Sequence, residues 1–273
     1  VLWCWMIWYT GVGLTRKGAT TMNVKTTIEW TDATWNPVTG CTKVSPGCAH
    51  CYAEAITLRF KRGGPFLPGK TTIRLHDDRL EQPSLWRSPH MIFVNSMSDL
   101  FHEEVPFDFV DRVFEVMREC NWHTYQVLTK RPERMLEYAE SRADGVAWPA
   151  HVWAGTSVEN QYWADRRIPL LRQVSATVRF LSCEPLLRPI DLRAHLDSVQ
   201  WVIVGGESGP RARPSNVEWI RDLRDQCQER GTAFFLKQLG GHPNKRGHDE
   251  AILDDRLWRG MPETKPLLVE QLT

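Results

Sequence analysis

Short apolar runs separated by amphipathic stretches recur along the chain from about residue 23 onward. The runs are rich in Val, Ile, Phe and Trp, and each ends in a polar or glycine-bearing loop. Runs of this kind are typical of strands that are buried on both faces. A first strand is expected just before a loop rich in cysteine. Six later strands are predicted at 90–94, 124–128, 152–154, 177–181, 199–204 and 233–236.

Helical patterns fill the intervals between these runs. Two segments, 107–120 and 216–230, carry apolar residues every three or four positions, which predicts one buried face on each helix. Ser215 followed by Glu218 has the spacing of a capping box at the start of the second helix. Further helices are expected over two more segments, one beginning at Pro132 and one over 52–62.

This alternation of strands and helices predicts a parallel sheet with right-handed crossovers, in the α/β class. Two architectures fit the pattern: an open doubly wound sheet, and a full or partial (βα) barrel of the TIM type. Both place functional groups at the carboxyl ends of the strands. The polar clusters of this sequence all follow apolar runs, so we expect the functional site at that edge of the sheet.

The chain of 273 residues is long enough to bury a core without disulfides. We expect one domain over 22–242, a polar tail over 243–273, and an upstream extension or disordered arm over 1–21. The formal net charge of +1 neither favours nor excludes a nucleic-acid partner. No segment approaches the length of a membrane helix, so we expect no membrane partner and a cytoplasmic location.

Three of the seven cysteines crowd into eleven residues, Cys41, Cys48 and Cys51, with the spacing C-x6-C-x2-C. An odd number of cysteines with such clustering does not suit a secreted disulfide framework and favours metal binding. Prolines and glycines predict an irregular loop around them. The loop therefore presents three sulfur ligands to one centre.

The ligand count separates the candidate metals. Structural zinc needs four protein ligands, whereas three thiolates around an iron–sulfur cluster leave one iron open to a small ligand. The count favours the cluster. Zinc stays an alternative, with His50 or Cys183 as the fourth ligand, and so does a loop without metal.

Polar residues at other strand ends are candidate ligand contacts. Gly205 and Gly206 permit close approach of a ligand to the backbone, and Glu207 and Ser208 could hydrogen-bond a ribose or an amino group. The alternative is a tight turn with a solvated glutamate. The spacing of this segment fits neither a P-loop nor a GxGxxG fingerprint.

Three more strand ends carry candidates of the same kind. Thr156 and Glu159 could meet a ribose or a carboxylate, or cap a helix. Lys130 suits a carboxylate or phosphate, although an exposed lysine is usually solvated. Glu184 could act as a general acid or base, or as a cap.

Six stretches of the sequence carry a resemblance to known proteins: WNPVTGCTKVSPGCAHCYAE, FVNSMSDLF, LTKRPER, VWAGTSVEN, FLSCEPLL and WVIVGGESGPRARP. The loop of three cysteines after a first strand resembles the radical S-adenosylmethionine (radical SAM) superfamily. More closely, the chain resembles a phage-associated three-cysteine-motif family of uncertain function that is related to this superfamily. The superfamily commonly has C-x3-C-x2-C, so the first gap is longer here.

The resemblance implies a radical-SAM-like barrel in which Cys41, Cys48 and Cys51 hold a [4Fe–4S] cluster. The open iron would bind S-adenosylmethionine, and an electron donor would drive its reductive cleavage to a radical. The resemblance also implies Ser98 and Asp99 as contacts of the methionine amino group, with a helix N-cap as the alternative.

A radical reaction could further use a thiol as hydrogen donor, which makes Cys183 a candidate catalytic residue alongside Glu184 and Lys130. A free cysteine is otherwise a small buried hydrophobe. Both interpretations of Cys183 stay open at this point.

Two classes of function follow. In the first, the chain is a radical enzyme that modifies a nucleic acid or nucleotide. In the second, it is a non-catalytic phage protein, stabilised by iron–sulfur or zinc, that binds nucleic acid or an unidentified partner protein. Residues 55–76 hold five basic and no acidic residues, and this segment could grip a phosphate backbone or form a solvated surface.

Overall fold

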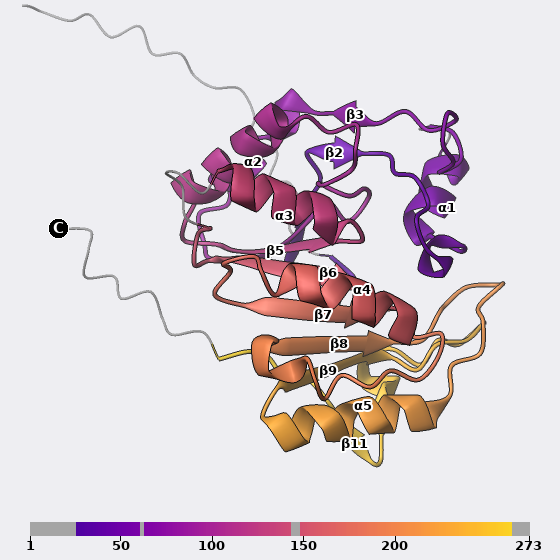
Figure 1. Ribbon diagram of the computed structural model, residues 1–273. Coiled ribbons are helices and arrows are strands. Elements are labelled where there is room, and N and C mark those ends of the chain that lie inside the picture. Colours follow the sequence, from indigo (N-terminus) through magenta and orange to yellow (C-terminus); the bar gives the residue numbers. More distant parts are fainter. Residues whose placement is uncertain (1–25, 61–62, 143–147, 264–273) are drawn as a thin grey trace, which may run out of the picture.

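The computed structural model describes residues 26–60, 63–142 and 148–263 (Figure 1). The predicted extension over 1–21 lies outside the described residues. Seven parallel strands form the main sheet. They are β1 (Ala33–Trp35), β4 (Met91–Val94), β5 (Thr124–Thr129), β6 (Val152–Ser157), β7 (Arg179–Cys183), β8 (Trp201–Gly205) and β9 (Ala233–Gln238).

The strands lie in the sheet in the order in which they occur in the chain, β1-β4-β5-β6-β7-β8-β9. A doubly wound sheet reverses its order at a switch point, and no reversal occurs here. The sheet also curls, because the ring centroids of Trp30, next to β1, and Trp201, on β8, are only 6.1 Å apart. The fold is therefore a partial TIM-type barrel, as predicted.

Helices cover the outer face of this curled sheet (Figure 1). Four of them follow strands β4, β5, β6 and β8 in turn: α2 (Phe107–Glu119), α3 (Pro132–Ser141), α4 (Gln161–Leu171) and α5 (Val217–Arg230). Pro132 occupies the first turn of α3, as expected from its fixed φ. At α5 the capping prediction was wrong by one residue, because Asn216 is the N-cap and its Oδ1 accepts from the Glu218 amide at 2.9 Å.

The two faces of the sheet bury different clusters. The larger cluster lies between the sheet and the helices and is mainly aliphatic. The smaller cluster fills the inside of the curl at the amino ends of the strands, and its buried members include Trp30, Trp153, Trp201 and Phe235. This aromatic plug closes one end of the half-barrel, so open space is left toward the carboxyl ends of the strands.

The chain between β1 and β4 forms a separate layer beside the barrel. It contains the antiparallel pair β2 (Val38–Thr39) and β3 (Arg74–Leu75) and the helix α1 (Tyr52–Arg59). In Figure 1 the helix α1 of this layer stands at the right, on the side toward which the orange strand β8 points, and β2 and β3 lie above the sheet. The cysteine loop runs between β2 and α1, so it is held over that edge of the sheet.

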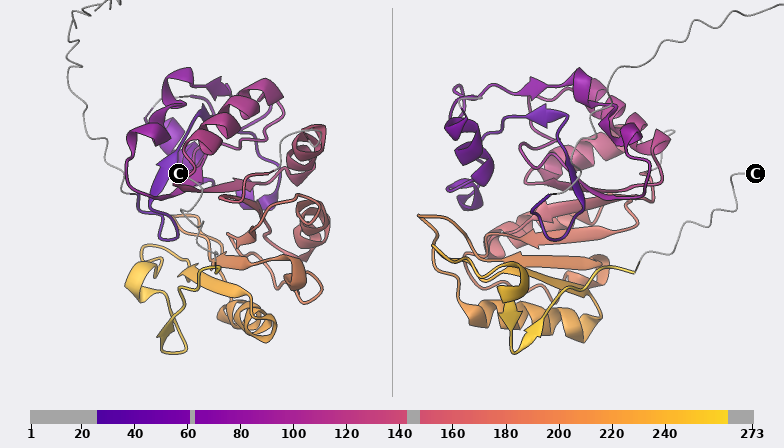
Figure 2. Two further views of the ribbon diagram at one scale, coloured as in Figure 1. Left: turned by 90° about the vertical axis from the view of Figure 1, so that its left-hand side faces the viewer. Right: turned by 180° about the vertical axis from the view of Figure 1, so that it is seen from behind.

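The described part of the tail, up to residue 263, packs against the last strand. The Leu236 amide donates to the Trp258 carbonyl at 2.9 Å, and the Trp201 indole donates to the Gly260 carbonyl at 2.9 Å. The short hairpin of β10 (Ile252–Leu253) and β11 (Arg256–Leu257) belongs to this segment, which is yellow beside α5 in Figure 2. This part of the tail thus wraps the body. None of the helices in the described part of the chain has the length and apolarity needed to cross a bilayer.

Candidate functional site

A cavity of about 540 Å³ opens at the carboxyl ends of the strands, between the barrel and the layer that carries α1. Residues at or just after the carboxyl ends of β4, β5, β6, β7, β8 and β9 all contribute to its wall. Ten of the predicted site residues line it: Cys41, Cys48, Cys51, Ser98, Asp99, Lys130, Glu184, Gly206, Glu207 and Ser208. The sheet thus brings together candidates that are up to 167 positions apart in the sequence, the span from Cys41 to Ser208.

The cysteine loop takes its shape from a few backbone features. Gly40, just before Cys41, has φ of +93°, a conformation that favours glycine, and a Cβ there would collide with the Thr72 carbonyl. Pro46–Cys48 forms one 3₁₀ turn, and Cys51 is the N-cap residue of α1. Each cysteine therefore occupies a distinct backbone setting within one loop.

Glu159 anchors this loop from below. Its Oε1 accepts hydrogen bonds from the Ser45 hydroxyl and, at 3.2 Å, from the Gly47 amide, while its Oε2 accepts from Arg167 at 2.9 Å. The glutamate and arginine side chains are both almost completely buried. Because Gly47 is pressed against Glu159, a Cβ at that position would lie 2.5 Å from the carboxylate. Glu159 holds the loop and does not line the cavity.

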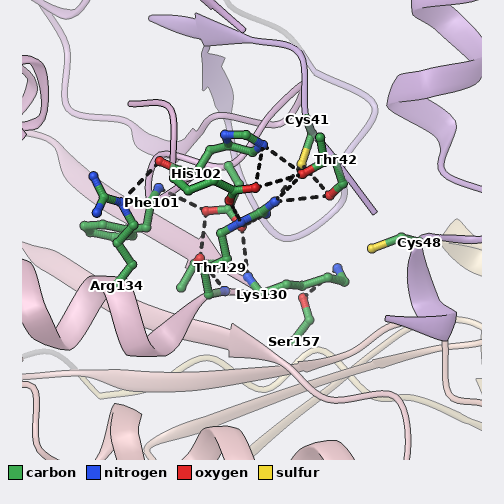
Figure 3. A network of polar contacts seen from close by, with 12 residues as sticks. Cys41, Thr42, Cys48, Phe101, His102, Thr129, Lys130, Arg134 and Ser157 are labelled. Carbon is green, nitrogen blue, oxygen red and sulfur yellow. Dashed lines mark hydrogen bonds and ion pairs between the residues drawn. The ribbon is translucent and has the colours of Figure 1, made fainter. Parts of the chain in front are cut away.

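Arg131 lies against Cys41 at the centre of a polar network (Figure 3). Its Nη1 is 3.7 Å from the Cys41 sulfur and 3.3 Å from Asp99 Oδ2, and its Nη2 donates to the Thr42 hydroxyl at 2.8 Å. Asp99 also accepts from the Thr129 hydroxyl at 2.7 Å. A guanidinium beside the sulfur favours the thiolate, which is the form that binds metal.

Burial works against that thiolate when no metal is present. Desolvation, reinforced by the charge of Asp99, raises the pKa of Cys41 to about 12, although Arg131 opposes the rise. Burial also raises the pKa of Cys51. Repulsion by the Cys48 thiolate adds to the rise in the pKa of both Cys41 and Cys51, so the three thiols are near enough to interact. A metal must therefore displace protons from at least two of these thiols.

The three thiols fit an iron–sulfur cluster in donor type and in number, and all three are free, half-buried and on one cavity wall. As they stand, no three Cys, His, Asp or Glu side chains within the described ranges converge closely enough to hold a metal ion. Their side chains would have to turn toward one another to ligate a cluster. The glycine-rich backbone of the loop permits such an adjustment.

Glu207 joins the loop after β8 to the cysteine loop. Its Oε2 is 3.0 Å from His50 Nδ1, and its two oxygens accept from the Arg213 guanidinium at 2.6 and 2.8 Å. Arg213 also reaches the Pro46 carbonyl at 3.0 Å. Burial by itself raises the pKa of Glu207, but the hydrogen bonds from Arg213 and His50 outweigh it and lower the pKa to about 2. The carboxylate therefore stays ionised at neutral pH.

Two further cation contacts lie in the cavity wall. Lys237 Nζ is 3.0 Å from Glu184 Oε1, and Lys130 Nζ donates to the Ser157 hydroxyl at 3.0 Å. Ser98 donates its own proton to the Val38 carbonyl at 2.8 Å, which leaves its oxygen lone pairs directed to other donors. The wall thus offers both acceptors and cations to a polar ligand.

Four predicted site residues lie outside the cavity wall. Alternate residues of a strand face opposite sides, so Cys183 points into the layer under the helices while Ser182 and Glu184 line the cavity. Thr156 is buried and donates to the Thr129 carbonyl at 2.9 Å. Glu159 anchors the loop, and Gly205 is buried within β8. Their predicted contacts with a ligand are not supported by these positions.

Sequence reasoning missed several residues of this wall and its support. In the sequence, Arg131 is recognisable only as a cation at the end of a strand. In the structure it contacts Cys41, which is 90 positions away in the sequence. Lys237 and Gln238 are the last two residues of β9 and follow the strand predicted over 233–236, so their position after an apolar run was the usable signal. Nothing local in the sequence marks Arg213 or Arg167 as partners of buried carboxylates.

Comparison with solved structures finds spore photoproduct lyase at low identity. One mutant of that lyase shares 14% identity at a TM-score of 0.46, with 83% of this chain and 62% of the lyase chain covered. The lyase complexed with dinucleoside spore photoproduct shares 11% identity at a TM-score of 0.43, covering 78% of this chain and 76% of the other. This chain spans less than two thirds of the first lyase structure, and likeness at this level carries no functional argument.

Comparisons of sequence give a family and no curated relative. No curated protein matched the chain. The model of DUF5131, described as a protein of unknown function, matches residues 25–262. That range includes the cysteine loop, the whole barrel and the segment that packs on β9. Because the match extends over nearly the whole sequence, this chain belongs to the DUF5131 family.

Proposed function

We propose that this chain is an iron–sulfur protein of the radical SAM type that reductively cleaves S-adenosylmethionine to modify a nucleic acid or nucleotide. The observation that carries the proposal is the placement of three free thiols from one loop on the wall of a cavity at the carboxyl edge of a partial barrel. That edge is where barrels of this type hold their reactive groups. An external electron donor is part of the proposal.

Cys41, Cys48 and Cys51 would hold the [4Fe–4S] cluster, leaving one iron without a protein ligand. When bound, the cluster would supply the electron that cleaves the sulfonium of S-adenosylmethionine to a carbon-centred radical. The protein's part in such chemistry is to bind, orient and exclude water. Arg131 contributes a fixed positive charge beside Cys41, which offsets the negative charge of the thiolates.

The wall residues suit the polar ends of S-adenosylmethionine. Ser98 has oxygen lone pairs available to an amino group, whereas Asp99 is already engaged by Thr129, Arg131 and two backbone amides. We therefore assign Asp99 to positioning Arg131 and Ser98 to ligand contact. Gly206 also lines the cavity, and its lack of a side chain lets the backbone after β9 pack against it, because a Cβ there would lie 2.5 Å from the Leu239 carbonyl.

Cations in the same wall support a substrate that carries phosphate. Lys130, Lys237 and Lys245 all line the cavity. The carboxylate of Glu184, held 3.0 Å from Lys237, is positioned to accept or return a proton at the substrate. A nucleotide would offer both the phosphate and the hydrogen-bonding groups that these side chains require.

Anaerobic reconstitution with iron and sulfide tests the metal assignment. The wild-type chain is expected to turn brown, with broad visible absorbance and about four irons per chain. Replacing Cys41, Cys48 and Cys51 together by alanine should abolish this absorbance, because three of the cluster's ligands are removed. Cys120→Ala is the matched control, since Cys120 is a buried cysteine at the end of α2 that does not line the cavity.

Production of 5′-deoxyadenosine by the reduced, reconstituted chain then tests the activity. Retention of the cluster without any spectral response to S-adenosylmethionine would instead favour the second class of function, a non-catalytic metal-stabilised protein that binds nucleic acid or a partner protein. A colourless wild-type chain that binds one zinc would contradict the proposal outright.

A further inference from the structure

A second cavity of about 510 Å³ adjoins the first. It lies between α1 and the β2–β3 pair, with Thr57 of α1, Thr39 of β2 and Arg74 of β3 in its wall. The apolar side chains of Ile56, Phe66 and Met97 line both cavities. One ligand lying over this shared wall would therefore reach both spaces.

The ionisable residues of the second cavity are all basic. Arg74, His76 and Arg79 line it, and its lining includes no carboxylate. Within the described residues, Arg74 forms no ion pair, and the Arg79 guanidinium donates to the Asn36 carbonyl at 3.3 Å. The carboxylates on the neighbouring turn face elsewhere: Asp77 pairs with Arg112 at 2.6 Å, and Asp78 is 3.9 Å from His76 Nδ1 with its side chain largely in solvent.

The cations concentrate positive potential in one space. Burial lowers the pKa of His76, and the charges of Arg79 and Arg74 lower it further, more than Asp78 compensates. His76 Nε2 is 2.8 Å from the Thr39 hydroxyl, and Thr72 adds another hydroxyl to the wall. Guanidinium groups that no carboxylate neutralises, together with hydroxyl donors, are the groups that bind phosphate.

We propose that the second cavity binds a backbone phosphate of a single-stranded nucleic acid whose neighbouring nucleotide enters the cysteine-lined cavity. This inference rests on the proposed function and names its substrate class. The shared apolar wall of Ile56, Phe66 and Met97 would contact the sugar or base between the two sites. A base can enter a cavity inside a protein only when it is unstacked, which favours a single strand over a duplex.

Fluorescence anisotropy with a short fluorescein-labelled oligothymidylate tests the inference on the full chain without metal. The Arg74→Gln/Arg79→Gln variant is expected to bind about tenfold more weakly than wild type, and the salt slope of the affinity should fall by about 1 for each phosphate that the variant no longer neutralises. Should the double variant fold poorly in a thermal melt, Arg74→Gln alone serves, because its side chain is exposed and bonds to no other described residue.

Arg172→Gln/Arg188→Gln is the matched control, because it removes the same charge from two exposed positions outside both cavities. It should bind the oligonucleotide as wild type does. Equal weakening of both double variants would show a general charge effect and overturn the inference. Equal affinity for a hairpin duplex, or full competition by thymidine 5′-monophosphate at matched phosphate concentration, would overturn the assignment to a single strand.

This binding assay is independent of the cofactor chemistry. Loss of oligonucleotide binding in Arg74→Gln/Arg79→Gln without any 5′-deoxyadenosine formation by wild type would support the second cavity and refute the radical activity. Formation of 5′-deoxyadenosine by wild type, with unchanged oligonucleotide binding in the variant, would support the radical activity and refute the role of the second cavity.

Discussion

The carboxylate of Glu207 shows how the role of a single residue depends on its neighbours. As a strand-end glutamate it was predicted to contact a ligand or to be solvated, but it is 6% exposed and is held by Arg213 and His50. Both of its oxygens already accept strong charge-assisted hydrogen bonds. It lines the cavity while also fastening the loop after β8 to the loop that carries the cysteines.

The variant Glu207→Gln tests whether the ionised carboxylate stabilises the fold by fastening these two loops together. The pKa of Glu207 is lowered from 4.5 to about 2, so its ionised form stabilises the fold above pH 4.5, and this contribution is lost as the pH falls toward 2. Urea unfolding of wild type and variant should show a constant difference in the free energy of unfolding above pH 4.5 that shrinks below it. A difference independent of pH from 2 to 7 would contradict the assigned role.

The cysteine loop, at the scale of an element, depends on a contact 112 positions away in the sequence. Glycine and proline in the loop predicted its irregular course, and its ends were recognised from the first strand and from the helix over 52–62, observed as Tyr52–Arg59. Its anchoring by Glu159 and Arg167 was not predictable. That pair becomes buried only when β6, α4 and the loop pack together.

Gly47→Ala tests the anchor. A Cβ at Gly47 would lie 2.5 Å from Glu159, so the loop must shift away from its buried carboxylate. We expect a loss of about 1–3 kcal/mol in the free energy of unfolding, and fewer irons per chain after reconstitution. Ala49→Ser, at an exposed position of the same loop, should change neither quantity. Wild-type iron content in Gly47→Ala would show that the anchor does not position the cysteines.

Strand boundaries illustrate the same dependence on neighbours. The apolar run predicted a strand over 177–181, whereas β7 spans Arg179–Cys183, and β6 extends to Ser157 beyond the predicted end at Ala154. Parallel neighbours on both sides supply hydrogen-bond partners to these polar residues, as in the pairing of Ser157 with Ser182. Pairing of this kind overrides local polarity at strand ends.

At the scale of the whole molecule, the C-terminal segment bridges the two edges of the curled sheet. Arg259 packs over Phe235 of β9, and its Nη2 is 2.9 Å from Glu29 Oε2, just before β1. The Glu29 side chain is buried, and its Oε1 also accepts from the His248 amide at 3.1 Å. These contacts tie the edges together where no strand pairing closes the barrel among the described residues.

A double-mutant cycle on Glu29→Gln and Arg259→Gln measures this closure. Because Glu29 is buried and the pair is hydrogen-bonded, we expect a coupling free energy of about 1 kcal/mol in urea unfolding. The exposed pair Arg193 and Asp222, at 3.1 Å, is the comparison cycle and should give roughly 0.5 kcal/mol or less. Equal coupling in both cycles would mean that the closure adds nothing beyond an ordinary surface ion pair.

The sequence by itself determined the α/β class, the alternation of strands and helices along the chain, and the edge of the sheet at which the polar candidates lie. These properties follow from local periodicity and from the residue types that come after each apolar run. It also identified the cysteine loop, because three thiols in eleven residues stand out without any knowledge of packing.

Only the tertiary structure decided which strand-end residues face the cavity. A strand changes face at every residue, so a shift of one position separates Glu184 in the wall from Cys183 beneath the helices. Packing of the cysteine loop over the carboxyl ends of the strands brings Cys41 to Arg131, and the second cavity arises where α1 lies against the β2–β3 pair. Contacts between residues so distant along the chain leave no local pattern, because they depend on how complete elements pack.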